Sequence, residues 1–380
     1  MLINMEWERT WEMNKWIKWS SVFMSASLLI GGAGGAHTAK ASDAAKAPTL
    51  KQAAQTVQVQ LVFNGNKLKQ QGILIDGRTM VPVTVLRDIA GVPITYDNST
   101  YTYNVGSGSS QLTLSTAENG LLTSVNHFYM GSISTEYNAV NIEGRIYVPF
   151  KLLNDVLEYE GAYDPASRML KLETREINSL QVMSGTLSQK TEDLEMVIRY
   201  PQITGLANGQ VQQQINEEFK NKADAFAAEG TERSSHRDPE LVPFPYSYNT
   251  NYMVAYNQNG VLSLLTDQST YTGGEDPVHR EAMTFSLKDG RLLSLSDFLP
   301  QGSGAEEKLY QILAERMLRD GSTFSLEQNL SSLQFYVSGA GLNFYFGDTG
   351  PESFAEGIRT YTVPFQELLP PGTDPFAAFK

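Results

Sequence analysis

The heptapeptide DGRTMVP at residues 76–82 recurs as EGRIYVP at residues 143–149. The two copies lie 67 residues apart, and further identities keep this offset without a gap. The identical pairs are Gly77/Gly144, Arg78/Arg145, Val81/Val148, Pro82/Pro149, Leu86/Leu153, Asp88/Asp155, Tyr96/Tyr163 and Asp97/Asp164. Self-similarity at one fixed offset is the signature of an internal structural repeat.

Each copy of the repeat predicts the same small unit. A strand leads into an acidic-Gly turn, and a second strand ends at a proline, which cannot donate a hydrogen bond to a sheet. A short amphipathic helix follows, and then a strand that ends in Tyr-Asp. We therefore expect the two copies to complete one α+β domain over residues 57–174 that folds without the rest of the chain.

The sequence after residue 176 has a different pattern. Helical spacing is found for Val211, Ile215, Phe219, Ala223 and Phe226. The dipeptides Asn259-Gly260 and Asp289-Gly290 are hairpin turn signals, and a third hairpin is expected around residues 339–341. Ser303-x-x-Glu306 fits a capping box that opens a second helix. The pattern predicts an antiparallel sheet with two helices, which is again an α+β arrangement.

Composition narrows the range of functions. A chain of 380 residues is long enough for two or three domains. It contains no cysteine, which excludes disulfides, thiolate nucleophiles and sulfur-ligated zinc. The net charge of −13 disfavours nucleic acid as a partner, because binding it requires Lys and Arg to neutralise phosphates. An acidic surface favours a cationic partner.

The N-terminus has the pattern of an export signal. Lys15 and Lys18 precede an apolar run at residues 22–36, and Ala39-Lys40-Ala41 supplies the small-x-small cleavage pattern. We expect a signal peptide at residues 1–41, cleaved after Ala41, and a linker at residues 42–56. The remaining chain carries 39 acidic and 25 basic residues, a net charge of −14. An uncleaved membrane anchor and a translation start at Met13 stay open as alternatives.

The repeat resembles a known family. Its Gly-Arg-x-x-Val-Pro and Tyr-Asp elements are similar to the stalk domain first described at the N-terminus of copper amine oxidases. The resemblance covers about 115 residues and implies a spacer or wall-proximal module that holds no copper. His127 is the one histidine of this region, which agrees with that implication.

The second half resembles the extracellular region of RsiV-type anti-sigma factors, a tandem pair of domains shared with some peptidoglycan deacetylases. The resemblance implies subdomains at residues 176–274 and 275–380. It rests on the motifs GVLSL (260–264), YTGG (271–274), FSLKDGR (285–291), LSDF (295–298), FYF (344–346) and GIRTYTVPFQEL (357–368). Glu275-Asp276 stands where the family has Ala-His, which puts any role of that histidine in doubt. The resemblance implies binding of lysozyme, whereas a cytoplasmic sigma-binding segment is not expected in this chain.

Residues for catalysis are sparse. The four histidines form no His-x-x-x-His or His-Glu-x-x-His pattern, and a three-histidine copper site cannot be assembled from His127, His236 and His279. No Gly-x-Ser-x-Gly elbow marks a nucleophilic serine. We therefore expect no enzyme activity, no cofactor and no metal. Glu275, Asp276 and His279 fit either a hard-cation site or, as we favour, a solvated loop after Gly273-Gly274.

Aromatic residues are the stronger candidates for binding. Rings alternate at residues 244, 246, 248, 252 and 256, so they predict either an exposed platform or part of a core. The candidate binding residues are Tyr246, Tyr248, Thr272, Gly273, Gly274, Glu275, Asp276 and His279.

The functional prediction follows from these features together. We expect a secreted or cell wall-associated, non-catalytic protein of a Gram-positive bacterium. Its expected partner is an extracellular protein, with a basic muramidase as first candidate, or a cell-wall glycan. Membrane contact is expected only through an uncleaved signal segment. The alternatives are a structural wall spacer and a cell-wall hydrolase that uses carboxylates.

Overall fold

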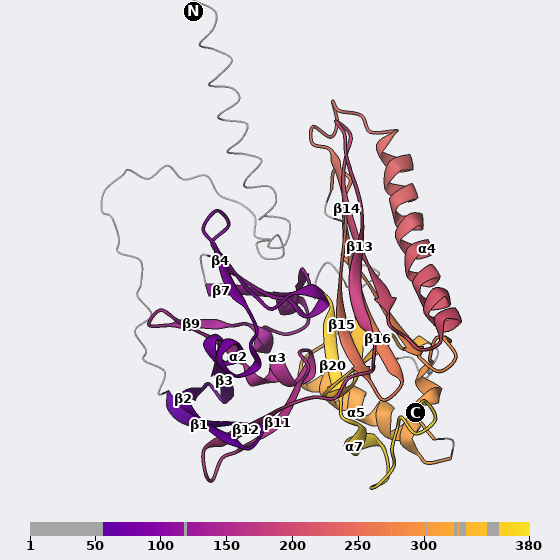
Figure 1. Ribbon diagram of the computed structural model, residues 1–380. Helices are drawn as coiled ribbons and strands as arrows, with labels where there is room; N and C mark the ends of the chain where they lie inside the picture. The colour runs from indigo at the N-terminus through magenta and orange to yellow at the C-terminus, as the bar shows by residue number, and fades with distance from the viewer. Residues whose placement is uncertain are drawn as a thin grey trace, which may run out of the picture. The chain divides into compact units, whose positions relative to one another are not determined.

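Two β-sheets built from the repeat form the N-terminal half of the described chain (Figure 1). The structure is a computed structural model that describes residues 56–117, 120–274, 276–300, 302–322, 326, 332–347 and 357–380. The predicted signal peptide (1–41), all but the last residue of the predicted linker (42–56) and Glu275 lie outside the described residues.

The first sheet joins the two copies of the repeat. In spatial order it contains β11 (Tyr159–Asp164), β12 (Met169–Thr174), β1 (Val57–Phe63), β2 (Asn66–Ile75), β3 (Arg78–Pro82), β10 (Arg145–Pro149) and β9 (Val140–Ile142). Strands β3 and β10 pair in antiparallel fashion, with Val81 opposite Val148. The equivalent strands of the two copies therefore lie side by side, and each proline ends its strand as predicted.

The repeat turns and helices also follow the sequence prediction. Asp76 and Gly77 have φ angles of 48° and 76°, and Glu143 and Gly144 have φ angles of 52° and 80°. Positive φ at both central residues is the requirement of a type I′ hairpin turn. Short helices α2 (Val83–Ala90) and α3 (Phe150–Asp155) begin directly after the two prolines.

The second sheet of this half is an antiparallel meander. It contains β4 (Ile94–Asp97), β5 (Thr102–Val105), β6 (Leu112–Ala117), β7 (Gly120–Val125) and β8 (Phe128–Tyr129). The β7–β8 turn consists of Asn126 and His127, both of which have positive φ. A one-turn 3-10 helix, η2 (Met130–Ser132), follows β8.

A long sheet backed by one helix forms the first part of the C-terminal half. Its strands, in spatial order, are β13 (Gln181–Lys190), β14 (Leu194–Thr204), β15 (Tyr246–Gln258), β16 (Val261–Tyr271) and β17 (His279–Ser286). Helix α4 (Gly209–Ser234) connects β14 to β15 and lies along the sheet (Figure 1). The five residues predicted to face inward from this helix are all buried.

The fold class predicted from the sequence, α+β, is confirmed. One strand pair differs from the expected antiparallel arrangement, since β14 and β15 are parallel. The reason is the crossover through α4, which returns the chain to the same end of the sheet. The sheet also continues through β17 to Ser286, beyond the boundary expected between residues 274 and 275.

A smaller sheet completes the chain. It contains β18 (Phe335–Ser338), β19 (Gly341–Phe346) and β20 (Arg359–Val363), with helices α5 (Ala305–Arg319) and α7 (Phe365–Leu368). The hairpins at residues 259–260 and 339–340 are confirmed. The chain also reverses at Asp289-Gly290, but the antiparallel pairing there is limited to an isolated bridge between Phe285 and Leu292, and no full second strand forms.

The predicted capping box of α5 is wrong. Gly304 is the N-cap residue, and the Ser303 hydroxyl only accepts a hydrogen bond from the Ala305 N–H at 3.3 Å. A capping box instead opens the 3-10 helix η4 (Leu295–Asp297), where Ser294 and Asp297 hydrogen-bond each other's backbone N–H groups. Glycine at residue 304 has a φ of 72°, which only this residue type adopts without strain.

The two halves share one hydrophobic core, and residues 54–380 form one compact unit. Buried side chains of the repeat, such as Leu61 and Phe128, belong to the same cluster as Met253, Leu265 and Tyr345. A separated repeat half therefore exposes apolar surface that the C-terminal half covers. Among the described residues, no helix is long and apolar enough to cross a membrane.

Candidate functional site

The predicted binding residues lie mainly at one end of the long sheet. This end, called the tip below, consists of residues 190–195, 229–246, 271–274 and 276–278. Tyr246 is the first residue of β15, Tyr271 is the last residue of β16, and Ser247 pairs with Tyr271. Thr272, Gly273, Gly274 and Asp276 belong to the β16–β17 loop, and His279 begins β17.

Tyr248 is not available as a binding residue. Its side chain is fully buried under α4, and its ring lies 5.1 Å from that of Phe226. A Cβ added at Gly230 of α4 would lie 2.9 Å from the Tyr248 ring. The prediction of an exposed aromatic platform is therefore wrong for Tyr248, because α4 covers the face of β15 that carries the even-numbered rings. Tyr246 is half-buried.

The β16–β17 loop is held by local hydrogen bonds. Thr272 Oγ1 donates to Asp276 Oδ2 at 2.9 Å, and Arg233 Nη2 of α4 donates to Thr272 Oγ1 at 3.3 Å. Gly273 has a φ of 104°, and a Cβ at this position would approach a Val242 methyl to 2.5 Å. The loop therefore needs glycine for its backbone conformation and for its close contact with the segment after α4.

Arg237 fixes the segment that follows α4. Its side chain is buried and donates through Nη2 to Asp193 Oδ1 at 2.8 Å. Nη1 of the same guanidinium donates to the carbonyl oxygen of Val242 at 2.5 Å, and Nη2 also donates to that of Glu192 at 3.1 Å. One planar group with several donors thus ties the β13–β14 turn to residues 238–245.

This segment displays two apolar side chains to solvent. Leu241 is 80% exposed and Phe244 is 65% exposed. The described tip residues include eight acidic and three basic ones. The acidic residues are Glu192, Asp193, Glu195, Glu229, Glu232, Asp238, Glu240 and Asp276.

Sequence reasoning included Phe244 among the alternating rings but chose Tyr246 and Tyr248, and it missed Leu241. The signal that was available is the pair of prolines at residues 243 and 245. A proline on each side of an aromatic residue prevents regular sheet pairing there. The aromatic side chain between the prolines is then more often exposed to solvent in a turn. Exposed large apolar residues within an acidic rim are typical of protein recognition.

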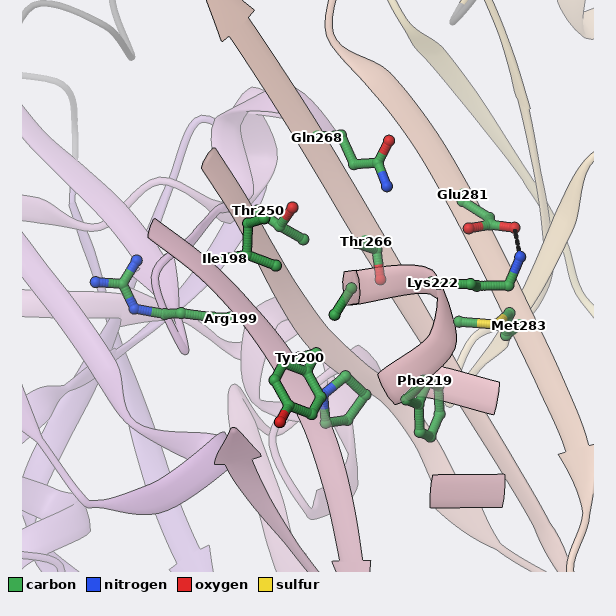
Figure 2. Close-up of a pocket in the computed structure, with 12 residues that line it drawn as sticks. Ile198, Arg199, Tyr200, Phe219, Lys222, Thr250, Thr266, Gln268, Glu281 and Met283 are labelled. Atoms are coloured by element: carbon green, nitrogen blue, oxygen red, sulfur yellow. Dashed lines mark hydrogen bonds and ion pairs between the residues drawn. The ribbon is translucent and has the colours of Figure 1, made fainter. Parts of the chain in front are cut away.

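A second candidate region is the pocket between α4 and the sheet (Figure 2). Lys222 Nζ and Glu281 Oε1 form an ion pair at 2.6 Å at its side, and the buried Thr250 hydroxyl has no hydrogen-bond partner among the described residues. Phe219 and Met283 supply apolar walls. The free volume of this pocket is about 20 Å³, which is room for a water molecule and not for a small-molecule ligand.

Side chains that could bind a metal ion are scattered over the described chain. Within the described ranges, no cluster of three or more His, Asp or Glu side chains is placed to hold a metal ion. His127 is exposed at the β7–β8 turn, far along the chain from His236 after α4 and His279 at the start of β17.

Two family models match the chain. Residues 62–172 match the copper amine oxidase N-terminal domain, and residues 187–279 match the family described as deacetylase PdaC. The first match covers the repeat, and the second covers most of the sheet from β13 to the start of β17. The resemblance to both families that the sequence motifs indicated is thereby confirmed.

Solved structures of the DUF3298 family are also similar to this chain. A member from Bacteroides fragilis is 15% identical, with a TM-score of 0.38, covering 54% of this chain and 98% of its own. One from Pseudomonas aeruginosa is 13% identical, with a TM-score of 0.35, covering 52% of this chain and 95% of its own. A comparison with curated proteins found no match.

The chain thus carries two successive regions, the first similar to the copper amine oxidase N-terminal domain and the second similar to deacetylase PdaC.

Proposed function

We propose that this chain is an exported envelope protein that binds a cationic extracellular protein through its tip, without catalysing a reaction. A lysozyme-type muramidase is the first candidate partner, as the resemblance to RsiV-type ectodomains implies. The observation that carries the proposal is the pair Leu241 and Phe244, displayed within the acidic tip.

The physical argument assigns different roles to charge and to apolar contact. Complementary charge chiefly accelerates association, and salt screens it over about 8–10 Å at physiological ionic strength. Apolar side chains that become buried in the complex chiefly slow dissociation, and rings are frequent among the residues that dominate binding energy. Arg237 holds the segment in place, so little conformational entropy is lost when a partner binds.

The test is the binding of a panel of basic muramidases to residues 42–380, the chain expected after cleavage of the signal peptide, measured by biolayer interferometry. We expect the association rate to fall as salt is raised. Leu241→Ala combined with Phe244→Ala should increase the dissociation rate and weaken binding by about 2 kcal/mol or more. Leu318→Ala is the matched control, because Leu318 is 83% exposed on α5, away from the tip.

Two outcomes would contradict the proposal. If no muramidase in the panel binds below about 100 μM, the lysozyme version fails. If Leu318→Ala weakens binding as much as the tip variant does, the tip is not the contact surface. A turbidity assay on peptidoglycan, with and without divalent metal ions, tests the alternative of a cell-wall hydrolase.

A further inference from the structure

The face of the long sheet opposite α4 is lined by polar side chains. Successive residues of a strand point to opposite faces, so the odd-numbered residues of β15 lie away from the helix. Near the N-terminal half these are the apolar Met253 and Ala255, which belong to the shared core. Towards the tip they are Asn251, Asn249 and Ser247. The face therefore changes from apolar to polar along a single strand.

Neighbouring strands extend this polar face by their register. Asn249 lies opposite Ser269 of β16 and beside Val197 of β14. Thr186 of β13 lies opposite Arg199 of β14. Thr186 is exposed, and the other four residues are half-buried. Amide and hydroxyl groups are thus spread over four adjacent strands.

Arg199 is the notable charge on this face. Its Nη1 donates to Asn251 Oδ1 at 3.1 Å, and no carboxylate of the described chain lies within ion-pair distance of it. Its side chain points away from the α4 pocket (Figure 2). Partial burial lowers its pKa from the usual arginine value, although a guanidinium stays charged at every physiological pH.

Two arginine side chains that are buried more deeply than Arg199 each have a carboxylate partner. Arg237 pairs with Asp193 at 2.8 Å, and Arg280 pairs with Asp267 at 2.7 Å. A charge withdrawn from water without a counter-charge is costly, because neither solvent nor protein compensates it. In a chain with a net charge of −13, an acidic partner for Arg199 would have been easy to supply. The Arg199 guanidinium, which has no carboxylate partner in the described chain, is therefore suited to bind an anionic group of a ligand.

His127 of the β7–β8 turn adds a second polar group. Burial and the nearby positive charge of Arg199 both lower the pKa of His127. The imidazole is then neutral at physiological pH and offers one donor and one acceptor. Its φ of 65° places this side chain at a turn position where Gly is the ordinary choice.

We propose that this face binds an acidic saccharide, with the Arg199 guanidinium on the sugar carboxylate and the side chains of Thr186, Asn249 and Ser269 on sugar hydroxyls. A guanidinium matches a carboxylate in planar, two-bond geometry. The array of amides and hydroxyls suits a polyol, whereas a polypeptide partner would leave many of these groups unpaired. This site is separate from the tip and does not depend on the function proposed for it.

The test uses two disaccharides of similar size. The first is N-acetylglucosaminyl-N-acetylmuramic acid, which carries a carboxylate, and the second is chitobiose, which carries none. Binding to the exported chain is followed by nitrogen-15 NMR at the arginine Nε–Hε signals, and the Arg199 signal is assigned by its loss in Arg199→Gln. We expect the acidic disaccharide to shift this signal and chitobiose to leave it unmoved.

Variants make the test quantitative. Arg199→Gln should weaken binding of the acidic disaccharide about 10- to 100-fold, as expected for loss of charged hydrogen bonds. Lys190→Gln is the control, because Lys190 lies on the same face but already pairs with Glu195 at 3.2 Å. Arg199→Lys should bind with intermediate affinity, since it keeps the charge but loses the planar fork.

The thermal midpoint of each variant separates a binding loss from a folding defect. If Arg199→Gln has a lower thermal midpoint than the unmodified protein, its weaker binding is not informative. The proposal is then tested only by the shift of the Arg199 signal in the unmodified protein. Equal binding of the two disaccharides, or an Arg199 signal unmoved by the acidic one at millimolar concentration, would overturn the proposal.

Discussion

The side-chain amide of Asn126 donates through Nδ2 to the backbone carbonyl oxygen of Tyr252 at 3.0 Å, although 126 residues separate the two. The Asn126 Oδ1 atom accepts a further hydrogen bond from Ser184 Oγ at 3.4 Å. β14 and β15 pair only as far as Ile198 and Thr250, so the Tyr252 carbonyl lies beyond their ladder. A turn of the N-terminal half thus satisfies a backbone group that the C-terminal sheet leaves open.

Replacing Asn126 with glycine should destabilise the whole described unit. Asn126 has a φ of 48°, which glycine adopts freely, so Asn126→Gly removes the amide without adding backbone strain. We expect the free energy of unfolding in urea to fall by about 1–3 kcal/mol, because a buried carbonyl loses its partner. Asn64→Gly is the matched control, since Asn64 has a φ of 46° in an exposed turn. Equal losses for both variants would contradict this account.

Arg280 makes the strongest polar link between the halves. It is 1% exposed, pairs with Asp267 and donates to Ser132 Oγ of η2 at 2.8 Å. Its guanidinium carbon also lies 5.4 Å from the Phe128 ring centre. We expect Arg280→Met to cost about 3–5 kcal/mol, because Asp267 is left as an uncompensated, largely buried charge.

Double replacement provides the check on this prediction. Arg280→Met with Asp267→Leu should recover much of the lost stability in urea unfolding. Arg291→Met removes an exposed pair with Asp297 and should cost about 1 kcal/mol or less. A loss from Arg280→Met as small as that from Arg291→Met would show that the link between the halves is weak.

The repeat turns should be equally sensitive in both copies. Gly77→Ala and Gly144→Ala should each cost about 1–3 kcal/mol, because both glycines have φ near 80°. No atom lies within 4 Å of a Cβ added at either position, so crowding does not contribute. Gly209→Ala, in the first turn of α4 with open space around it, is the control and should not destabilise. Thermal melting of the three variants compares them directly.

Lowering the pH should remove the contribution of the Asp297 carboxylate to the stability of the folded protein. The Arg291 guanidinium beside it, together with the Ser294 hydrogen bonds, holds the pKa of this carboxyl below its ordinary value of 3.8. A depressed pKa in the folded state means that the stabilisation is complete above about pH 5 and is lost as the pH falls through the folded-state pKa. We expect Asp297→Asn to lower the free energy of unfolding by about 1 kcal/mol at pH 6. The effect is this small because solvent screens the partly exposed pair.

The difference between Asp297→Asn and the unmodified protein should shrink between about pH 4 and pH 2. Urea unfolding at several pH values measures it. A difference that stays constant over this range would mean that the carboxyl charge is not the source of the stabilisation.

The sequence alone determined features that depend on neighbouring residues. The acidic-Gly turns, the strands that end at Pro82 and Pro149 and the Asn259-Gly260 hairpin are all set by local backbone conformation. The inward face of α4 followed from helical spacing, because a period of 3.6 residues is a property of the segment itself. The two family resemblances rest on the same local motifs, so they also were readable from the sequence.

Only the tertiary structure decided which surfaces are covered. Alternation along β15 showed that Tyr246, Tyr248 and Tyr252 share a face, but not that α4 packs over it and buries Tyr248. In the same way, Arg237 and Arg280 received carboxylate partners from other segments, whereas Arg199 did not. Burial and ion pairing depend on which distant segments meet, and a local pattern carries no information about that meeting.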